Sequence, residues 1–451
     1  MKSGDGRKKT MNRVELKKVK SLKGEITPPP DKSISHRAVM FASIAEGKSI
    51  VRNFLWAEDP INTMNAMRML GVEIEQPSAI SHQPSAIVIH GQGLHGLREP
   101  FDVINCGNSG TTMRLISGIL AGNPFFTVLT GDDSLKQRPM ARVINPLQEM
   151  GADIFARNND KYPPIAIKGG GVKGITCKMP IASAQVKSCL ILAGLYADGT
   201  TIITEPQKSR DHTERMLKAM GADIEVDGLT IKVRGQRSEV RGQELNPLDI
   251  TIPADFSSAA FFIVAALMVP DSEVLIKGVG INPTRTGLLD VIKDMGGNLR
   301  IENIRDVSGE PVADIYCRTA SSLKAVKIGA DIMPSLIDEF PILCVLAAQA
   351  DGISEIRGAE ELRVKESDRI KVMAEGLRRI GVEVEELPDG MVIHGTTHLK
   401  GATIESHGDH RVAMAFSIAG LLSEDRITIK DTACIDTSFP EFFNYIERLI
   451  D

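Results

Sequence analysis

The apolar positions of this chain repeat with a period of about 75 residues. Six times, an Ala-rich apolar helical segment runs into a glycine or a turn and then into a β-branched strand, and the turns fall near positions 47, 122, 199, 271, 352 and 424. In the first copy, Ile34, Ala38, Phe41 and Ala45 keep the spacing of one helix face. Self-similarity of this length predicts a fold that is built from repeated units.

A second repeated phrase supports the same period. Five helical segments end at a glycine and run into a strand, and a sixth, FFNYIERLI, reaches Leu449. The five glycines are Gly71, Gly151, Gly221, Gly296 and Gly381. Each unit is therefore expected to run helix, strand, helix, strand, which predicts an α/β fold made by repetition.

Six units in a chain of this length favour two similar lobes of three units each. Proline-rich breaks occur at residues 27–32 (TPPPDK) and 246–255 (NPLDITIPAD). We predict a first lobe over residues 30–252 and a second lobe made of residues 1–29 and 253–451, with residues 1–12 disordered. The chain would cross between the lobes at two neighbouring points, which predicts a hinge there.

Composition excludes several classes of protein. A net charge of −5 and an aromatic content of 4% argue against nucleic-acid binding, which needs a basic footprint and stacking rings. No apolar window approaches 18 residues, so we expect no membrane span, and the basic start MKSGDGRKKTM lacks the apolar core of a signal peptide. Six cysteines without a CxxC pair fit a reduced, cytoplasmic setting.

Basic residues gather at the expected N-termini of helices, where cations are normally unfavourable. They are Lys32 and Arg37, Arg138, Arg210, Lys365 and Arg369, and His410 and Arg411. A helix N-terminus already attracts anions, so added cations make sense if an anion arrives, and the pattern predicts a small polyanionic ligand. Ion pairing with neighbouring Asp and Glu residues, as in VKESDRI, is the alternative interpretation.

Other motifs carry less weight. GQGLHG at residues 91–96 has the spacing of a dinucleotide-binding loop, but Pro100 follows where a helix should begin. HGDH at residues 407–410 could bind a metal, although a histidine beside Arg411 at a helix start suits an anion better. Asp338, Glu339 and Glu366 lie among the basic residues, either as structural ion pairs or as proton carriers.

Taken together, the motifs resemble those of the EPSP synthase family (5-enolpyruvylshikimate-3-phosphate synthases) from about Val14 to the C-terminus. The matching segments are PDKSISHR, NSGTTMRL, GDDSLKQRPMAR, ASAQVK, SRDHTE, NPTR, LIDEFP, RVKESDR, DHRVAMAF and TSFPEF. RPMAR, SAQVK, RDHTE and NPTR are similar to the class II branch of that family.

The resemblance implies the enolpyruvyl transferase fold, in which the helix N-termini of two lobes face the cleft between them. It also implies transfer of the enolpyruvyl group of phosphoenolpyruvate to the 5-hydroxyl of shikimate 3-phosphate, with release of phosphate, on the way to the aromatic amino acids. The implied steps are addition to C2 with protonation of C3, a tetrahedral intermediate, and elimination. No metal or organic cofactor is expected, and the implied protein is a cytoplasmic monomer.

The resemblance also assigns residues. Those implied to bind shikimate 3-phosphate are Lys32, Ser33, Arg37, Ser183, Ala184, Gln185, Arg210, Asp338 and Lys365. Those implied to bind phosphoenolpyruvate are Lys32, Asn108, Gly110, Arg138, Gln185, Arg369 and Arg411. Asp338 would orient and deprotonate the 5-hydroxyl, Glu366 would deliver a proton to C3, and Lys32 would assist the proton transfers.

The chain departs from class I members at two positions. Thr437 stands where many of them have a lysine that contacts phosphoenolpyruvate, and Ala184 lacks a hydroxyl ligand that they carry. Gly110 is retained where some glyphosate-tolerant class II enzymes carry alanine, so we expect room for glyphosate as an inhibitor.

Two rival functions share the implied scaffold. UDP-N-acetylglucosamine enolpyruvyl transferases typically carry a reactive Cys, sometimes Asp, in the loop that here reads GDDSLKQRPM, and the DKS and SAQ motifs favour shikimate 3-phosphate instead. A non-catalytic phosphometabolite-binding protein is the second rival. The presence of Lys32, Asp338 and Glu366 argues against it.

Overall fold

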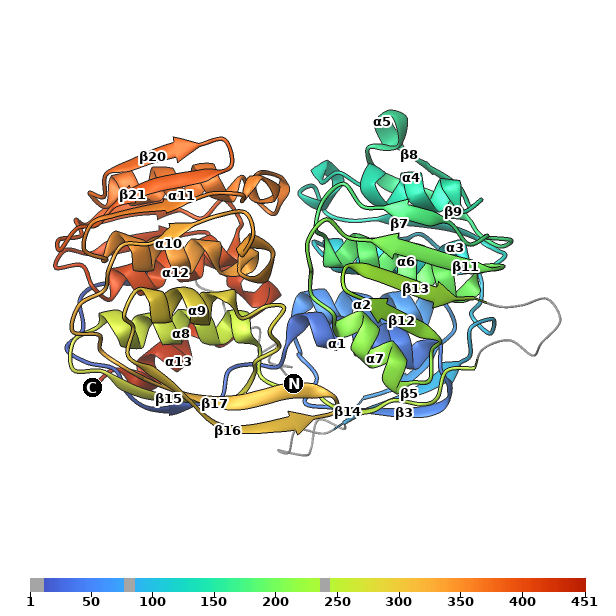
Figure 1. Ribbon diagram of the computed structural model, residues 1–451, viewed down its shortest axis with the longest axis horizontal. Coiled ribbons are helices and arrows are strands. Elements are labelled where there is room, and N and C mark those ends of the chain that lie inside the picture. Colours follow the sequence, from blue (N-terminus) through green and yellow to red (C-terminus); the bar gives the residue numbers. More distant parts are fainter. Residues whose placement is uncertain (1–11, 77–85, 236–243) are drawn as a thin grey trace, which may run out of the picture.

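Two bodies of similar size lie side by side in the computed structural model, which describes residues 12–76, 86–235 and 244–451 (Figure 1). Each has its own hydrophobic core, one drawn from residues 34–252 and the other from residues 22–26 and 256–449. The two cores support the proposed lobe boundaries, which are residues 30–252 for the first lobe and residues 1–29 and 253–451 for the second lobe. The expected disorder of residues 1–12 lies, except for Asn12, outside the described residues.

Over its described residues, the first lobe contains three four-stranded sheets. In spatial order they are β14 (Asp249–Thr251), β3 (Glu46–Arg52), β5 (Ile87–Gln92) and β4 (Glu73–Glu75); β6 (Ile104–Asn105), β7 (Phe126–Thr130), β9 (Tyr162–Lys168) and β8 (Asp153–Ala156); and β10 (Thr176–Lys178), β11 (Thr200–Thr204), β13 (Thr230–Arg234) and β12 (Ile224–Asp227). The helices are α1 (Lys32–Ser43), α2 (Glu58–Met69), α3 (Gly110–Ala121), α4 (Ala141–Glu149), α6 (Ala184–Tyr196) and α7 (His212–Ala219), with the short η1 (Leu135–Gln137) and α5 (Arg157–Asp160).

The second lobe repeats this plan within the described chain. Its sheets are β16 (Leu299–Val307), β17 (Glu310–Arg318), β15 (Glu273–Gly280) and β2 (Lys23–Ile26); β18 (Lys327–Ile328), β19 (Ile353–Ile356), β21 (Gly390–His394) and β20 (Val384–Leu387); and β1 (Arg13–Leu16), β23 (Ile427–Lys430) and β22 (Ala402–Glu405). Its helices are α8 (Phe256–Met268), α9 (Gly287–Asp294), α10 (Phe340–Ala348), α11 (Arg369–Arg379), α12 (His410–Gly420) and α13 (Phe442–Leu449), with the short η2 (Met333–Ser335), η3 (Ile337–Glu339), η4 (Glu360–Val364) and η5 (Thr432–Thr437).

The units contain more strands than the sequence predicts. In the second unit a strand precedes the first helix, since β6 pairs in parallel with β7, and a hairpin strand β9 runs antiparallel between β7 and β8. The expected order of helix, strand, helix, strand was therefore incomplete. The leading strands are only two to four residues long, which is too short for their alternation to be read from the sequence.

Two of the leading strands are exchanged between the lobes. β2 precedes the first unit in the chain but pairs with β15 of the second lobe, whereas β14 precedes the fourth unit and pairs with β3 of the first lobe. The two crossing segments lie against each other, because the N–H of Asp31 donates to the carbonyl of Pro253 and the N–H of Asp255 donates to that of Pro29, at 2.8 Å each. The N-terminal strand β1 completes the last sheet beside β23.

The first helix of each unit is enclosed by protein on almost every side. These helices are α1, α3, α6, α8, α10 and α12, and their residues are buried nearly throughout. The second helices, such as α4, α9 and α13, bury a single face and are amphipathic. An enclosed helix can meet a ligand only at its ends, so the position of those ends decides where function lies.

Candidate functional site

Six enclosed helices begin at one cavity of about 400 Å³ between the lobes. The residues at these helix starts that line it are Lys32 of α1, Gly110 of α3, Ala184 of α6, Asp255 at the N-cap of α8, Asp338 just before α10, and His410 of α12. Asp and Ser residues cap five of the helices by accepting hydrogen bonds from first-turn N–H groups, namely Asp31, Ser109, Ser183, Asp255 and Asp409. Six positive helix ends around one space make it an anion site.

Positive charges are in excess around the cavity, whereas the whole chain carries a net negative charge. The lining cations are Lys32, Arg37, Arg114, Arg138, Arg142, Arg210, Arg285, Lys365, Arg369 and Arg411, and they outnumber the carboxylates of Asp59, Asp255, Asp338, Glu360, Glu361 and Glu366. The net charge of the chain is −5. Local excess of positive charge within an acidic protein indicates a small, multiply charged anion as the ligand.

The cations at the N-terminus of α1 are held by the first lobe itself. Lys32 lies 3.1 Å from Asp59, and Arg37 donates from Nε to Thr213 at 2.8 Å and from a terminal nitrogen to Ser188 at 2.9 Å. These contacts tie α1 to α6 and α7, and burial lowers the pKa of Arg37 to about 10. Lys32 and Arg37 are therefore held within the first lobe, whereas Asp31, the N-cap residue of α1, is bound by Arg285 of the second lobe.

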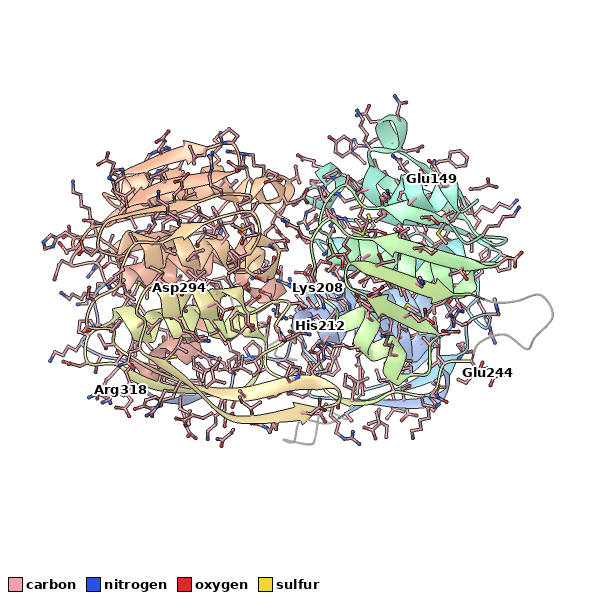
Figure 2. The ribbon with its side chains drawn as sticks, viewed as in Figure 1. Glu149, Lys208, His212, Glu244, Asp294 and Arg318 are labelled. Carbon is pink, nitrogen blue, oxygen red and sulfur yellow. The ribbon has the colours of Figure 1, made fainter. Side chains whose placement is uncertain are left out.

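A buried ionic cluster supports the neighbouring segment that carries Arg210. Lys187 of α6 lies 2.7 Å from Glu214 and 3.0 Å from Glu205, and it also donates to the carbonyl of Ser209 at 3.2 Å. Figure 2 shows Lys208 and His212, which flank Arg210 in the chain, at the boundary between the lobes. The cluster thus fixes the loop from which Arg210 reaches across the cleft.

Asp338 of the second lobe is surrounded by cations from both lobes. Its carboxylate lies 2.7 Å from Arg210, 3.4 Å from Arg411 and 3.8 Å from Arg369. Burial alone would raise the pKa of Asp338, but Arg210 and Arg411, followed by Lys365 and Arg369, hold it well below its usual range. Asp338 is therefore ionised at neutral pH, and it becomes a better proton acceptor once a ligand draws these cations away.

Glu366 bridges the lobes in the same way. Its two oxygens lie 3.4 Å from Arg138 of the first lobe and 2.6 Å from Arg369 of α11, and Arg369 also donates to Asp409 at 2.8 Å. Burial opposes ionisation, but Arg369 and Arg138 hold the pKa of Glu366 well below its usual range. An anion that binds these two arginines would compete for their charge and would raise that pKa.

Lys365 and Arg114 are two further cations of the cavity whose pKa is lowered by burial. Burial lowers the pKa of Lys365 to about 8 and that of Arg114 to about 9, the latter with help from Arg142 and Arg138. Arg114 also donates to Gln185 at 2.5 Å, which turns this amide toward α3. Like charges crowded in a buried space are costly without a ligand, so their presence favours an anion between them.

Sequence reasoning missed three residues that shape the cavity. Arg114 lies inside NSGTTMRL, one helical turn after Gly110, and that spacing could have revealed it. Arg142 of α4 pairs with Glu361 of η4 at 2.6 Å across the cleft. Arg285 binds Asp31 and, at 2.8 Å, Asp255, and so joins the two crossing segments. Contacts between lobes leave no periodic signal in a sequence.

Most residues that the sequence assigned to the site line this cavity, and Asn108 is the exception. Asn108 lies in the turn before α3, where its side chain contacts Asp132 and Arg138. Gly110 lines the cavity, and a Cβ there would come within 2.9 Å of the Arg114 guanidinium and 3.4 Å of that of Arg138. Thr437, in the described segment η5, lies outside the lining and donates to the carbonyl of Cys434 at 2.8 Å.

The segments GQGLHG and HGDH lie in structural settings that differ from those their spacing suggests. No helix follows GQGLHG directly, since the described chain after β5 stays irregular until β6. In HGDH, Asp409 caps α12 and accepts from Arg369, and the one candidate metal cluster among the described residues lies elsewhere, at Glu73, Glu75 and His90.

All six cysteines are free. Among the described helices, none is long and apolar enough to cross a membrane.

Comparisons with known proteins show what the whole chain is similar to. The family model described as EPSP synthase (3-phosphoshikimate 1-carboxyvinyltransferase) matches residues 16–446. A 3-phosphoshikimate 1-carboxyvinyltransferase of Thermodesulfovibrio yellowstonii is 58% identical over 97% of this chain and 100% of its own length. One of Geotalea uraniireducens is 53% identical over 98% of this chain and 100% of its own length.

Solved structures show the same likeness in three dimensions. An EPSP synthase from Acinetobacter baumannii superimposes with a TM-score of 0.84 at 46% identity, covering 97% of this chain and 98% of its own. The enolpyruvyl transferase NikO from Streptomyces tendae has a TM-score of 0.75 at 17% identity over 96% of both chains. At that identity the second likeness concerns the fold alone.

Proposed function

This chain belongs to the EPSP synthase family, and we propose that the cavity between its lobes is the active site for the family reaction. The reaction transfers the enolpyruvyl group of phosphoenolpyruvate to the 5-hydroxyl of shikimate 3-phosphate and releases phosphate, within the shikimate pathway. The observation that carries the assignment of the site is the meeting of six helix N-termini and an excess of cations at one cavity. Both substrates carry a phosphate and a carboxylate, so both need such a place.

Shikimate 3-phosphate belongs at the first-lobe end of the cavity. Its phosphate fits the N-termini of α1 and α6, with Lys32, Ser33, Arg37, Ser183, Ala184, Gln185 and Arg210 around it. Lys365 and Asp338 would then meet the ring hydroxyls from the second lobe. Ala184 offers its backbone N–H without a hydroxyl, so we expect the phosphate to rely more on the helix end than on side-chain hydroxyls.

Phosphoenolpyruvate belongs between Arg138 of the first lobe and the pair Arg369 and Arg411 of the second. Forked guanidinium groups donate two parallel hydrogen bonds to a carboxylate or a phosphate, which fixes the orientation of a small planar anion. Gly110, Gln185 and Lys32 line the same region, and Asn108 acts there through its contact with Arg138. Since its ligands come from both lobes, this half of the site is complete only when the lobes are together.

The carboxylates supply the proton transfers. Asp338, ionised by its arginines, takes the proton of the 5-hydroxyl as that oxygen attacks C2. Glu366 gives a proton to C3, which it can carry once phosphoenolpyruvate draws Arg138 and Arg369 away from it. The tetrahedral intermediate collapses when C3 loses a proton again and the bond from C2 to the phosphate oxygen breaks. Lys32 lies beside both substrates and assists these transfers.

The decisive experiment measures phosphate release when the protein is mixed with phosphoenolpyruvate and shikimate 3-phosphate. UDP-N-acetylglucosamine serves as the alternative acceptor in a parallel reaction, and Asp338→Asn and Glu366→Gln are run beside the natural chain. We expect release with shikimate 3-phosphate alone and its near loss in both variants. Release that both variants retain in full would overturn the assignment of the site.

Three further properties belong to this proposal. Glyphosate should compete with phosphoenolpyruvate, because Gly110 leaves the space beside Arg114 and Arg138 open. Light scattering should find a monomer of 48.9 kDa. Six free cysteines fit the reducing cytoplasm, and cell fractionation should find the protein there. Glyphosate that fails to compete even in large excess would remove the first of these.

A further inference from the structure

An aspartate outside the cavity lining uses its two carboxylate oxygens for two different partners. Asp132 lies in the loop between β7 and η1, where its Oδ1 accepts from the backbone N–H of Leu135, the first residue of η1, at 2.7 Å. Its Oδ2 accepts from the side-chain Nδ2 of Asn108 at 2.6 Å. Both oxygens of Asp132 are therefore engaged in holding the chain.

The contact with Asp132 determines which way the Asn108 amide faces. On its other side, the Oδ1 of Asn108 accepts from the Arg138 guanidinium. A carboxylate only accepts hydrogen bonds and a guanidinium only donates them, so an asparagine between the two has one favourable orientation. If Asp132 were lost, the amide could turn and present its N–H groups to the arginine.

Arg138 depends on its hydrogen bond to Asn108 because its guanidinium has few other contacts within the described part of the first lobe. Its side chain is buried, and its Nε has no hydrogen-bond partner within the described residues. In its own lobe the guanidinium donates to Asn108 and, at 3.3 Å, to Ser134, and among the described residues its other polar contact is Glu366 of the opposite lobe. Asn108 is thus the main contact that could hold Arg138 in place while the lobes are apart.

We propose that Asp132 is a positioning residue for phosphoenolpyruvate, which fixes the Asn108 amide and thereby the direction of Arg138. The inference rests on the proposed function, in which Arg138 binds that substrate. It extends the site by one layer, to a residue that touches neither substrate. Shikimate 3-phosphate is held by other helices, so its binding should not depend on Asp132.

The direction in which phosphoenolpyruvate affinity changes distinguishes a positioning role of Asp132 from a purely electrostatic effect of its charge. Removing a negative charge near an anion site should by itself tighten anion binding. Loss of the amide orientation should instead weaken the binding of phosphoenolpyruvate. The neighbouring Asp133 is a matched control, because its side chain is 99% exposed and its ion pair with Lys136 is long, at 3.5 Å. Asp133→Ala makes the same charge change without touching Asn108.

The experiment measures KM for each substrate in Asp132→Ala, Asp132→Ser and Asp133→Ala. Serine at position 132 keeps an oxygen for the N–H of Leu135 but cannot reach Asn108, so the loop should stay folded while the amide is released. We expect both Asp132 variants to raise KM for phosphoenolpyruvate about tenfold, because that factor corresponds to the loss of one hydrogen bond to a charged group. KM for shikimate 3-phosphate should change less than about twofold, and Asp133→Ala should change neither constant by more than that.

Two comparisons make the result decisive. In an Asn108→Ala background, Asp132→Ala should add almost nothing, since the residue through which it acts is gone. Arg138→Lys tests the underlying assignment, and an unchanged KM for phosphoenolpyruvate in that variant would fail the proposed function itself. If Arg138→Lys raises this KM but Asp132→Ala lowers it or leaves it unchanged, the positioning role is wrong. A rise in Asp132→Ala that Asp132→Ser does not share would assign the effect to loop folding and would also overturn the proposal.

Discussion

The two ends of the cavity are held together in different ways. At the first-lobe end, Arg37 is bound to Thr213 and Ser188 and Lys187 is bound to two glutamates, and all of these partners belong to the same lobe. At the opposite end, the carboxylates of Glu366 and Glu361 pair with arginines of the other lobe, and Asp338 of the second lobe reaches Arg210 of the first-lobe end. We infer that the first arrangement would persist if the lobes separated, whereas the second needs both lobes together.

This difference suggests how one cavity can bind two substrates in a fixed order, first shikimate 3-phosphate and then phosphoenolpyruvate. In the proposed site, the end held mainly by the first lobe would be ready for shikimate 3-phosphate before the lobes close. The end assembled across the cleft would gain its arginines and its proton carriers together, so phosphoenolpyruvate would meet the chemistry only in the closed state. Each prediction below removes one part of that contrast.

The largest effect should come from the proton acceptor. Asp338→Asn keeps the size of the side chain but removes the base, so kcat should fall by about a thousandfold, the usual contribution of general base catalysis. Shikimate 3-phosphate should still bind, because most of its ligands are in the first lobe. Steady-state rates with calorimetric binding check both statements. A variant that retained more than a tenth of the kcat would leave Asp338 without its proposed role.

The first-lobe support should be costly to remove. Lys187→Met leaves Glu205 and Glu214 buried without their cation, and it should lower the free energy of unfolding by about 3–5 kcal/mol. Adding Glu214→Gln should recover part of the loss. Lys293→Met is the matched control, because its pair with Asp290 is exposed and should be worth less than about 1 kcal/mol. Urea titrations compare the variants, and equal losses at the two lysines would contradict the account.

The pH dependence should show an alkaline limit from Lys365. Burial lowers its pKa to about 8, so the ammonium that meets shikimate 3-phosphate is lost as the pH rises through that value. For this substrate, kcat/KM, which reports the free enzyme, should fall about tenfold per pH unit above it. Lys365→Arg keeps its charge and should move the limit upward. An unchanged limit in that variant would assign it to another group.

The smallest effect should come from the pair at the mouth of the cleft. Arg142 and Glu361 lie partly exposed and touch across the lobes at 2.6 Å, so Arg142→Gln should weaken phosphoenolpyruvate binding only about threefold. The exchanged pair Arg142→Glu with Glu361→Arg should recover most of this loss. Binding titrations in the presence of shikimate 3-phosphate measure both. If the exchanged pair were weaker than either single variant, the contact would not act as a bridge between the lobes.

Particular residues show which features of the fold and of the site could be predicted from the sequence. The period of the apolar positions predicted the repeated α/β units, and the basic residues at helix starts predicted an anion site, because both are local signals. The predicted boundaries put β2 in the second lobe and β14 in the first, but the strands with which they pair, β15 and β3, escaped prediction, since pairing between distant short strands has no local signature. Arg142, Glu361 and Arg285 were missed for the same reason. Their partners lie in other units, and only the fold brings them together.

The most direct test of the two-ended cavity is a calorimetric titration of each substrate alone and with the other. Shikimate 3-phosphate should bind by itself, while phosphoenolpyruvate should bind at least about tenfold more tightly once shikimate 3-phosphate is present, since closure then completes its ligands. Equal affinity for phosphoenolpyruvate with and without the partner substrate would show that its site does not depend on closure. That result would contradict the account.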